Sequence, residues 1–399
     1  MRNPVRDYAW GHKEHIPRLL GLYWPKGKPA AELWMGAHST TPSVIFENGK
    51  KIALDGWIEK QREAALGENI AREYGRLPYL FKLLAADKSL SIQAHPSKKE
   101  AEAGFERENQ LGIPLNSPQR NYKDNNHKPE IIMAISPFTA MIGFRPLSEI
   151  SRRFRQLDSF SKQGLFPEPI LTALDRKDSR SLEQLLRIML TLNANQRGAL
   201  LAAALDTGIY QGGWDYHQCE WVPKLAGQFP DDIGALAPLF LNIVKLQPGE
   251  ALYQPAKTLH AYLEGFGAEL MANSDNVLRG GLTPKHVDAD ELLGVLDYSP
   301  FTPAILKLRE KINLIQYYPA PAHEFALGTA VLDTENAEPV SLSGSEGPLI
   351  IFCLEGRAAL NNGSESLSLK AGQSAFVPCG ESTIHIGGRC RIVLAKPGS

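Results

Sequence analysis

The sequence has little of what several common protein classes require. Only 4 of its 399 residues are cysteine, and no Cys-x-x-Cys pair is present, so a thiolate zinc cluster is not indicated. Basic and acidic residues balance at 43 against 44, which disfavours a nucleic-acid binder that neutralises phosphates. No apolar run approaches the roughly 18 residues of a membrane span, and the first residues lack the apolar stretch of a secretory signal. We therefore expect a cytoplasmic protein with free thiols and no membrane or nucleic-acid partner.

The phosphate and nucleophile motifs of several enzyme classes are also missing. The chain has no Gly-x-x-x-x-Gly-Lys-Ser/Thr loop, no strand-linked Gly-x-Gly-x-x-Gly and no Gly-x-Ser-x-Gly elbow. Nucleotide-dependent and serine-hydrolase functions therefore have no support. The composition, with 43% hydrophobic and 22% charged residues, is that of an ordered globular protein, and the length suggests two or three domains.

The apolar pattern changes character twice along the chain. Up to about residue 146, short apolar runs such as 79–84 and 131–135 predict strands. From Ser148 to about residue 232 the spacing becomes helical, with Ser148 and Ser181 as expected N-terminal caps. After Pro238 the strand pattern returns. The pattern predicts an all-α domain, residues 147–233, inserted into a β domain formed by 1–146 and 234–300.

An internal repeat indicates a second β domain. Residues 246–255 (LQPGEALYQP) resemble 369–378 (LKAGQSAFVP): in both, a Gly turn leads into a short apolar strand and Pro follows six positions later. This pattern resembles the second conserved motif of cupins, which are double-sheet jelly rolls. A Pro-containing linker begins near residue 299. We expect a mainly β protein with two cupin-type jelly-roll domains, the second lying with its linker in 301–399, plus the helical insertion.

Four separated residues form a candidate metal site. On a strand, Gln93 and His95 point to the same face, and Glu130 stands at the start of an apolar run. His260 follows the first copy of the repeat. Two imidazoles, one carboxylate and one amide oxygen suit Zn²⁺ or a similar divalent ion, and would leave a zinc site with a formal charge of +1. Taken singly, each of these residues is more often structural.

The segment 269–285 is dense in polar groups. Arg279 offers a rigid fork of donors and Lys285 a movable cation, and both suit a phosphate or a developing oxyanion. The alternative interpretation is a polar surface loop with an ordinary salt bridge.

Together these segments resemble the type I mannose-6-phosphate isomerase (phosphomannose isomerase) family over nearly the whole chain. The motifs that carry the resemblance are 8–11 (YAWG), 31–38 (AELWMGAH), 91–96 (SIQAHP), 122–130 (YKDNNHKPE) and 260–285, in which Ala268 and Gly280 depart mildly from the family pattern. The resemblance implies a zinc enzyme that interconverts mannose 6-phosphate and fructose 6-phosphate, with one zinc ion per chain. It implies a small sugar phosphate as the binding partner, and we expect a monomer.

The resemblance also implies roles for individual residues. The implied metal ligands are Gln93, His95, Glu130 and His260; the implied catalytic residues are Arg279, Lys82, Lys128 and Asp275; the implied substrate-binding residues are His127, Glu269 and Lys285. The identity of the general base stays open among Asp275, Glu269, Lys82 and His127. The expected phosphate ligand is Lys285, with Lys128 as the second choice. The second repeat lacks a matching ligand set, so we expect it to be non-catalytic and His385 to be an ordinary strand residue.

Two other function classes stay open from the residues alone. A cupin oxygenase would use redox iron and commonly a three-His site. A sugar-binding cupin without turnover is the other alternative, although it would have no need of Arg279, Lys285 and Asp275 together. For the isomerase, the residues suit proton transfer between adjacent carbons through a cis-enediol, with positive charge stabilising the oxygen that becomes negative.

Overall fold

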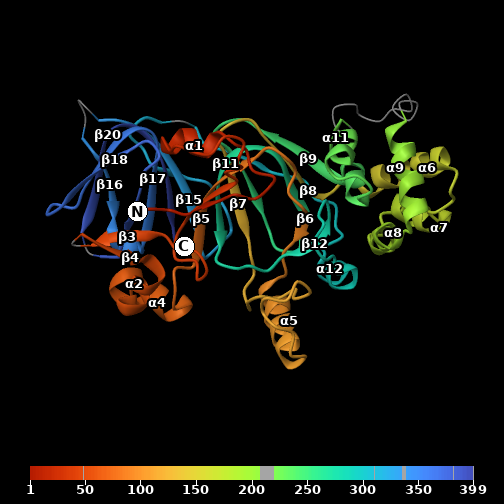
Figure 1. Cartoon of the computed structure of the whole chain (residues 1–399), viewed down its shortest axis with the longest axis horizontal. Coiled ribbons are helices and arrows are strands. Elements are labelled where there is room, and N and C mark those ends of the chain that lie inside the picture. The colour runs from red at the N-terminus through yellow and green to blue at the C-terminus, as the bar shows by residue number, and fades with distance from the viewer. Residues whose placement is uncertain (48, 207–219, 310, 335–337, 381, 399) are drawn as a thin grey trace.

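The structure is a computed structural model that describes residues 1–47, 49–206, 220–309, 311–334, 338–380 and 382–398. The helical block lies at one end of the molecule and a seven-stranded sheet at the other, with an eleven-stranded sheet between them (Figure 1). The predicted mainly β fold with helical parts is confirmed.

No described helix combines the length and apolar character needed to cross a bilayer. Cys353, Cys379 and Cys390 are free, as expected, and Cys219 lies outside the described residues.

The eleven-stranded sheet is built from the first three quarters of the chain. Its strands are β1 (Val5–Arg6), β2 (Glu32–Met35), β5 (Tyr79–Ala86), β6 (Ile92–Ala94), β7 (Glu130–Ala134), β8 (Phe138–Phe144), β9 (Leu241–Leu246), β10 (Glu250–Gln254), β11 (His260–Ala272), β12 (Leu278–Gly281) and β13 (Ile305–Lys307). The strands predicted at 79–84 and 131–135 are β5 and β7. A separate hairpin pairs β3 (Val44–Glu47) with β4 (Lys50–Ala53).

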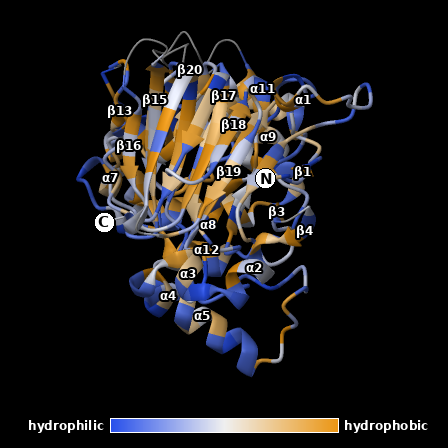
Figure 2. Ribbon diagram, turned by 90° about the vertical axis from the view of Figure 1, so that its left-hand side faces the viewer, coloured by the Kyte–Doolittle hydropathy of each residue, from blue (hydrophilic) through white to orange (hydrophobic). Residues whose placement is uncertain are grey.

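The seven-stranded sheet comes from the C-terminal part. Its strands are β14 (Gln316–Tyr317), β15 (Ala326–Asp333), β16 (Val340–Ser343), β17 (Leu349–Asn361), β18 (Ser366–Lys370), β19 (Ser374–Val377) and β20 (Thr383–Lys396). Apolar and polar residues mix along its neighbouring strands β15, β20, β17 and β18 (Figure 2). This mixture is typical of a sheet with one face buried and one face solvated.

The helices gather in two regions. Those before β7 are α1 (His15–Leu20), α2 (Leu54–Lys60), α3 (Arg62–Leu66), α4 (Glu68–Tyr74) and α5 (Lys98–Gln110). The later ones are α6 (Leu147–Ser161), α7 (Glu168–Asp175), α8 (Arg180–Thr191), α9 (Ala194–Leu205), α11 (Trp221–Gln228) and α12 (Ala289–Val295), with short 3-10 segments at η2 (Ile233–Leu239) and η3 (Gly344–Glu346). The described helices of 147–205 and 221–228 therefore lie where the apolar spacing predicts them.

Both predicted caps of this block are wrong. Helix α6 begins at Leu147 behind Pro146, whose φ of −51° already suits a helix start, so Ser148 lies inside the first turn. Helix α8 begins at Arg180, and there Asp178 accepts the Arg180 N–H at 3.1 Å. The Ser181 hydroxyl donates to the same carboxylate at 3.4 Å and caps nothing. An acidic side chain two residues upstream has taken the role expected of the serine.

Strand β11 connects the parts of the eleven-stranded sheet. Its first residues, beginning at His260, pair with β6 and β8, and its second part, from Gly265 onward, pairs with β5 and β7. The partner strands change at Gly265. This residue has φ 128° and lies against Phe138, so that an added Cβ would come within 2.7 Å of the Phe138 Cα. One strand thereby gathers residues from four others at one place.

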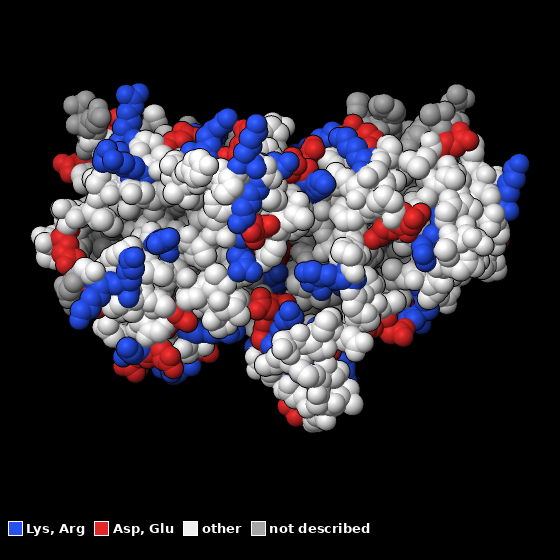
Figure 3. Space-filling model, viewed as in Figure 1, with Lys and Arg blue, Asp and Glu red and all other residues white. Residues whose placement is uncertain are grey.

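Charged side chains of both signs are interspersed over the face seen in Figure 3. This distribution agrees with the near-zero net charge of −1.

Candidate metal centre and its cavity

Three residues predicted as metal ligands meet in the core of the eleven-stranded sheet. His95, Glu130 and His260 each offer a ligand atom, and these atoms all lie within 4.8 Å of one another. The sheet register explains part of the meeting, because His260 opposes Gln93 across β11 and β6. Each of the three side chains is about 1% exposed, so the centre is sealed from bulk water.

Contacts between the four predicted ligands are close but imperfect as hydrogen bonds. His95 Nε2 lies 3.3 Å from Glu130 Oε1, and His260 Nε2 lies 3.4 Å from Glu130 Oε2. The Gln93 amide faces His260 Nε2 at 3.4 Å. All four predicted ligands are therefore brought together, three of them fully buried.

Backbone carbonyls fix the tautomers of both histidines. His95 Nδ1–H donates to the Asn276 carbonyl at 2.7 Å, and His260 Nδ1–H donates to the Thr258 carbonyl at 2.9 Å. Because a carbonyl oxygen can only accept, each Nδ1 carries the proton and each Nε2 keeps a lone pair. Both lone pairs belong to the atoms that face Glu130.

Two atoms at this centre have no hydrogen-bond partner among the described residues although they are buried. They are His95 Nε2 and Glu130 Oε2. Buried polar atoms without partners are rare in folded proteins and call for an ion or a water. These two atoms are a ring nitrogen and a carboxylate oxygen, and both can give an electron pair to a divalent cation.

The protonation states of the centre also suit a cation. Burial, and next the charge of Lys128, lowers the pKa of His95 to about 4, so its ring is neutral near pH 7. Burial alone would raise the pKa of Glu130, but the charge of Lys128, whose Nζ lies 3.0 Å away, and the contacts with His95 and His260 together outweigh it and hold that pKa well below its usual range. A neutral imidazole and an ionised carboxylate are the forms that bind metal.

A cavity of about 610 Å³ opens beside this centre. Among its walls are these predicted site residues: Lys82, Gln93, Lys128, Asp275, Arg279 and Lys285. Arg279 opposes Gln93 across β12 and β6, so both side chains lie on the same side of the sheet. The cavity therefore brings the metal centre and the predicted polar residues of segment 269–285 together.

Four cations on the cavity wall have no ion-pair partner among the described residues: Lys88, Lys123, Arg279 and Lys285. Burial lowers the pKa of Arg279; burial, followed by the charges of Arg279 and Lys123, lowers that of Lys285. Mutual repulsion of unpaired cations is relieved by an anion. Lys123 was missed by the sequence reasoning, although its place inside the motif 122–130 was a usable signal.

Lys82 belongs to a buried ion network. Its Nζ lies 2.9 Å from Glu269 and 3.8 Å from Glu32. Burial alone would lower the pKa of Lys82, but the charges of the two carboxylates outweigh it and raise that pKa above its ordinary value. Lys82 therefore stays protonated near neutral pH. Glu269 is fully engaged in this network and is not among the residues that line the cavity.

His127 lies elsewhere. Its Nε2 pairs with Glu324, which precedes β15 in the C-terminal part of the chain, and His127 is not among the cavity-lining residues. The expected substrate contact of His127 gains no support from this placement.

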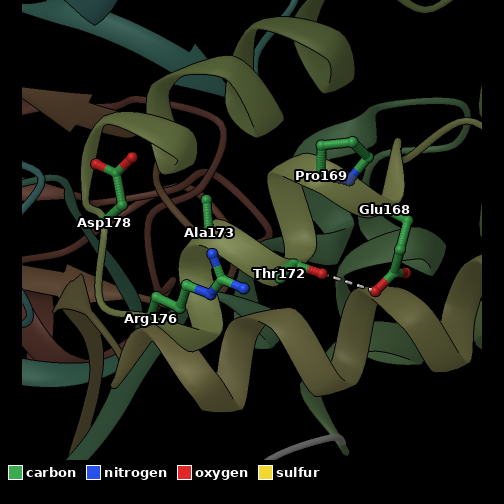
Figure 4. Close-up of a pocket in the computed structure, with 6 residues that line it drawn as sticks. All are labelled: Glu168, Pro169, Thr172, Ala173, Arg176 and Asp178. Carbon is green, nitrogen blue, oxygen red and sulfur yellow. Dashed lines mark hydrogen bonds between the residues drawn. The ribbon is translucent and has the colours of Figure 1, made fainter.

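Other hollows of the described structure carry no comparable chemistry. One lies on the helical block and is lined by Glu168, Pro169, Thr172, Ala173, Arg176 and Asp178, with the Thr172 hydroxyl donating to Glu168 (Figure 4). Within the described residues, the seven-stranded sheet contributes no set of three metal-binding side chains. His385 there is bonded to the Ser341 hydroxyl at 2.9 Å, as fits an ordinary strand residue.

Comparisons with known proteins agree along the whole chain. Residues 1–147 match the family model of the phosphomannose isomerase type I catalytic domain, and residues 322–397 match that of the mannose-6-phosphate isomerase cupin domain. The mannose-6-phosphate isomerases of Salmonella typhimurium and Escherichia coli are each 39% identical to this chain, over 98% of it and 97% of theirs.

Solved structures give the same result. A crystal structure of mannose 6-phosphate isomerase in its zinc-bound holo form superposes with a TM-score of 0.88 at 37% identity, covering 100% of this chain and 98% of that one. A variant of phosphomannose isomerase from Salmonella typhimurium superposes with a TM-score of 0.89 at 37% identity and the same coverage.

Proposed function

Because this chain belongs to the type I mannose-6-phosphate isomerase family, we propose that it is a zinc-dependent aldose–ketose isomerase that interconverts mannose 6-phosphate and fructose 6-phosphate. The observation that carries the proposal is the meeting of Gln93, His95, Glu130 and His260 beside a cavity walled by unpaired cations. The proposed division of the chain is a catalytic cupin domain of 1–146 and 234–300, a helical domain of 147–233, and a C-terminal cupin-like domain with its linker in 301–399.

The donor set fits one zinc ion per chain. Two neutral imidazoles, one carboxylate and one amide oxygen match the preferences of Zn²⁺, and two of their atoms lack partners. Gln93 would offer its amide oxygen, and the orientation of an amide is assigned from its neighbours. When bound, zinc supplies a positive charge that polarises a sugar oxygen.

The cations of the cavity divide between two tasks in this proposal. Lys285 and Lys123 bind the phosphate of the substrate, which carries a charge near −2 at neutral pH. Arg279, which stands opposite Gln93, faces the oxygen that becomes negative during proton transfer. Lys128 is engaged with Glu130 at 3.0 Å, which makes it less available to the phosphate.

Asp275 is the proposed proton-transfer group. Among the four candidates it is the one carboxylate that lines the cavity, and its pKa is lowered; Lys82 stays protonated, Glu269 is bound to Lys82, and His127 is bound to Glu324. Asp275 accepts the proton from one carbon and returns it to the adjacent one through a cis-enediol, while the hydroxyl proton of the first carbon passes to the former carbonyl oxygen, so no net proton is consumed. A carboxylate acts as such a base when it lies within hydrogen-bond reach of the proton.

The alternative classes have less support. The centre holds two histidines, a glutamate and a glutamine, which differs from the three-His site expected of a cupin oxygenase. A binder without turnover leaves the cavity carboxylate Asp275 without a task.

A coupled assay tests the proposal. Purified protein is incubated with fructose 6-phosphate, mannose 6-phosphate formation is followed, and the assay is repeated after chelation and after zinc is restored. We expect turnover that chelation abolishes and zinc restores, with His385→Ala as a matched control that behaves as wild type. Zinc-loaded protein without turnover would refute the proposal, and turnover that depends on oxygen would support the oxygenase class.

A further inference from the structure

His38 is a buried histidine that lies outside the proposed set of metal ligands and cavity cations. It ends the motif 31–38, after strand β2, and is 4% exposed. Its Nε2 lies 3.3 Å from the Oδ1 of Asp275, a residue 237 positions later in the chain. A buried imidazole thus touches the carboxylate proposed to move the proton.

The hydrogen bonds of His38 fix which nitrogen carries its proton. Nδ1 faces the backbone N–H of Thr40 at 3.3 Å and the Thr40 hydroxyl at 3.0 Å. Because a backbone N–H can only donate, Nδ1 is an acceptor and Nε2 carries the hydrogen. His38 therefore donates to Asp275 even when its ring is neutral.

The ring of His38 is also held in place by its neighbours. It packs edge-on against Trp34, with ring centroids 4.8 Å apart and planes at 66°. Trp34 is itself fixed, because its indole N–H donates to Glu32 at 2.8 Å and the Arg6 guanidinium lies over its ring. The His38 Nε2–H that faces Asp275 is therefore held in a fixed position.

Asp275 depends on that donor for its orientation. Its backbone N–H donates to Asp124 at 2.7 Å, which anchors the main chain but leaves the side chain free to rotate. In the described part of the chain, His38 is the one side chain that hydrogen-bonds the Asp275 carboxylate. That carboxylate is 44% exposed and lines the cavity, so without His38 it would sample several rotamers.

We propose that His38 is a positioning residue, whose Nε2–H holds the Asp275 carboxylate in the orientation that accepts and returns the substrate proton. The inference rests on the proposed function and deepens it, since it adds a residue of the motif 31–38 to the reacting site. Orientation of a reacting group is worth a large part of a catalytic rate, and a shift of about 1 Å can cost about a hundredfold.

The electrostatics of the pair agree with this role. Burial alone would raise the pKa of Asp275, but the hydrogen bond and charge of His38 outweigh it and lower that pKa to about 2. The other charged groups that face Asp275 are Lys128, Lys123 and, at its backbone, Asp124. Loss of His38 therefore raises the pKa of Asp275 and moves the acid limb of the pH profile to higher pH.

The test compares His38→Ala with His38→Gln, which keeps an N–H near the place of Nε2. For zinc-verified protein we expect His38→Ala to lower kcat by about 10- to 100-fold with KM little changed. The acid limb of kcat/KM should move upward by roughly one pH unit. His38→Gln should recover most of kcat, and His385→Ala should behave as wild type.

A double-mutant cycle separates positioning from general structural damage. In an Asp275→Asn background, His38→Ala should cost little more, because its effect runs through the Asp275 carboxylate. An equal loss in both backgrounds, or an unchanged kcat and pH profile in His38→Ala, would overturn the proposal. If His38→Ala does not fold, the same comparison is made with His38→Gln and His38→Asn.

A readout without turnover distinguishes failure of the inference from failure of the proposed function. Carbon NMR of the Asp275 carboxyl, assigned with Asp275→Asn, should give a higher pKa in the His38 variant than in wild type. An unchanged titration contradicts the contact itself. If the titration changes in the variant but wild-type protein turns over no sugar phosphate, the contact is supported. The proposed function is then refuted and, with it, the catalytic part of this inference.

Discussion

At the scale of single residues, the candidate metal centre combines what the sequence can reveal with what it cannot. The two-residue spacing of Gln93 and His95 and the candidacy of Glu130 and His260 are visible in the sequence, and the family resemblance implies that all four are ligands. The carbonyl of Asn276, which fixes the tautomer of His95, lies 181 residues away. Such contacts depend on strand register and could not be predicted from one sequence.

The ligand role of His260 leads to the first prediction. Because His260 is proposed to supply one of two imidazole ligands, His260→Ala should lose bound zinc and lower kcat by at least about 10³-fold while the protein stays folded. Metal analysis, circular dichroism and the coupled assay check this. Full turnover in a metal-verified sample of the variant would contradict the assignment.

The second prediction concerns Arg279. Since its guanidinium is expected to face the oxygen that becomes negative, Arg279→Ala should lower kcat by about 10²-fold with zinc content unchanged. Lys123→Ala and Lys285→Ala serve as matched comparisons, because loss of a phosphate contact should mainly raise KM. If Arg279→Ala raises KM alone, Arg279 is a phosphate ligand.

At the scale of elements, β11 and α5 set the geometry of the centre. β11 pairs with β5, β6, β7 and β8, and Ser97 begins α5 with a capping box to Glu100 directly after the metal segment. The strand periods of β5 and β7 were predictable because apolar runs are local signals. The caps at Ser148 and Ser181 were not, because Pro146 and Asp178 outcompete them locally.

The third prediction tests the bend in β11. Gly265→Ala places a Cβ about 2.7 Å from the Phe138 Cα at a φ of 128°, so the free energy of unfolding should fall by about 2–3 kcal/mol. Denaturant titration checks it. The control is Gly198→Ala inside α9, where an added Cβ meets nothing within 4 Å, and where stability should rise by about 0.5–1 kcal/mol. Equal effects of the two substitutions would contradict a special role of Gly265.

At the scale of the whole molecule, the two sheets share one buried core. Leu33 and Phe81 of the catalytic sheet belong to the same apolar cluster as Phe352 and Val393 of the C-terminal sheet. The Tyr79 hydroxyl donates to the carbonyls of Pro348 and Ala395, at 3.0 and 3.1 Å. The sequence repeat predicted a second β domain, but contacts over more than 250 positions leave no local pattern from which the shared core could be predicted. The division into domains stays a prediction.

The fourth prediction uses the contact between Glu324 and His127, which ties the C-terminal part to the motif 122–130. Burial alone would raise the pKa of Glu324, but the hydrogen bond and charge of His127 outweigh it and lower that pKa below its ordinary value of 4.5. A carboxyl whose pKa is lowered by folding stabilises the protein above its unfolded pKa and loses that stabilisation as the pH falls through the folded value. Stability should therefore decline below about pH 4.5.

Glu324→Gln isolates this contribution. The variant should be less stable near pH 7 by about 1–3 kcal/mol, and its stability should decline less steeply in acid than that of wild type. Denaturant titrations between pH 3 and 7 check both effects. Parallel curves for the two proteins would show that the pair does not contribute.

The central claim is that four side chains, spread over residues 93–260, hold one zinc ion beside the cavity. Anomalous diffraction from zinc-loaded crystals, recorded above and below the zinc absorption edge, tests it most directly. The account predicts one strong peak per chain, within bonding distance of Gln93, His95, Glu130 and His260. A peak at another place, or none among these four residues in protein that contains zinc, would contradict it.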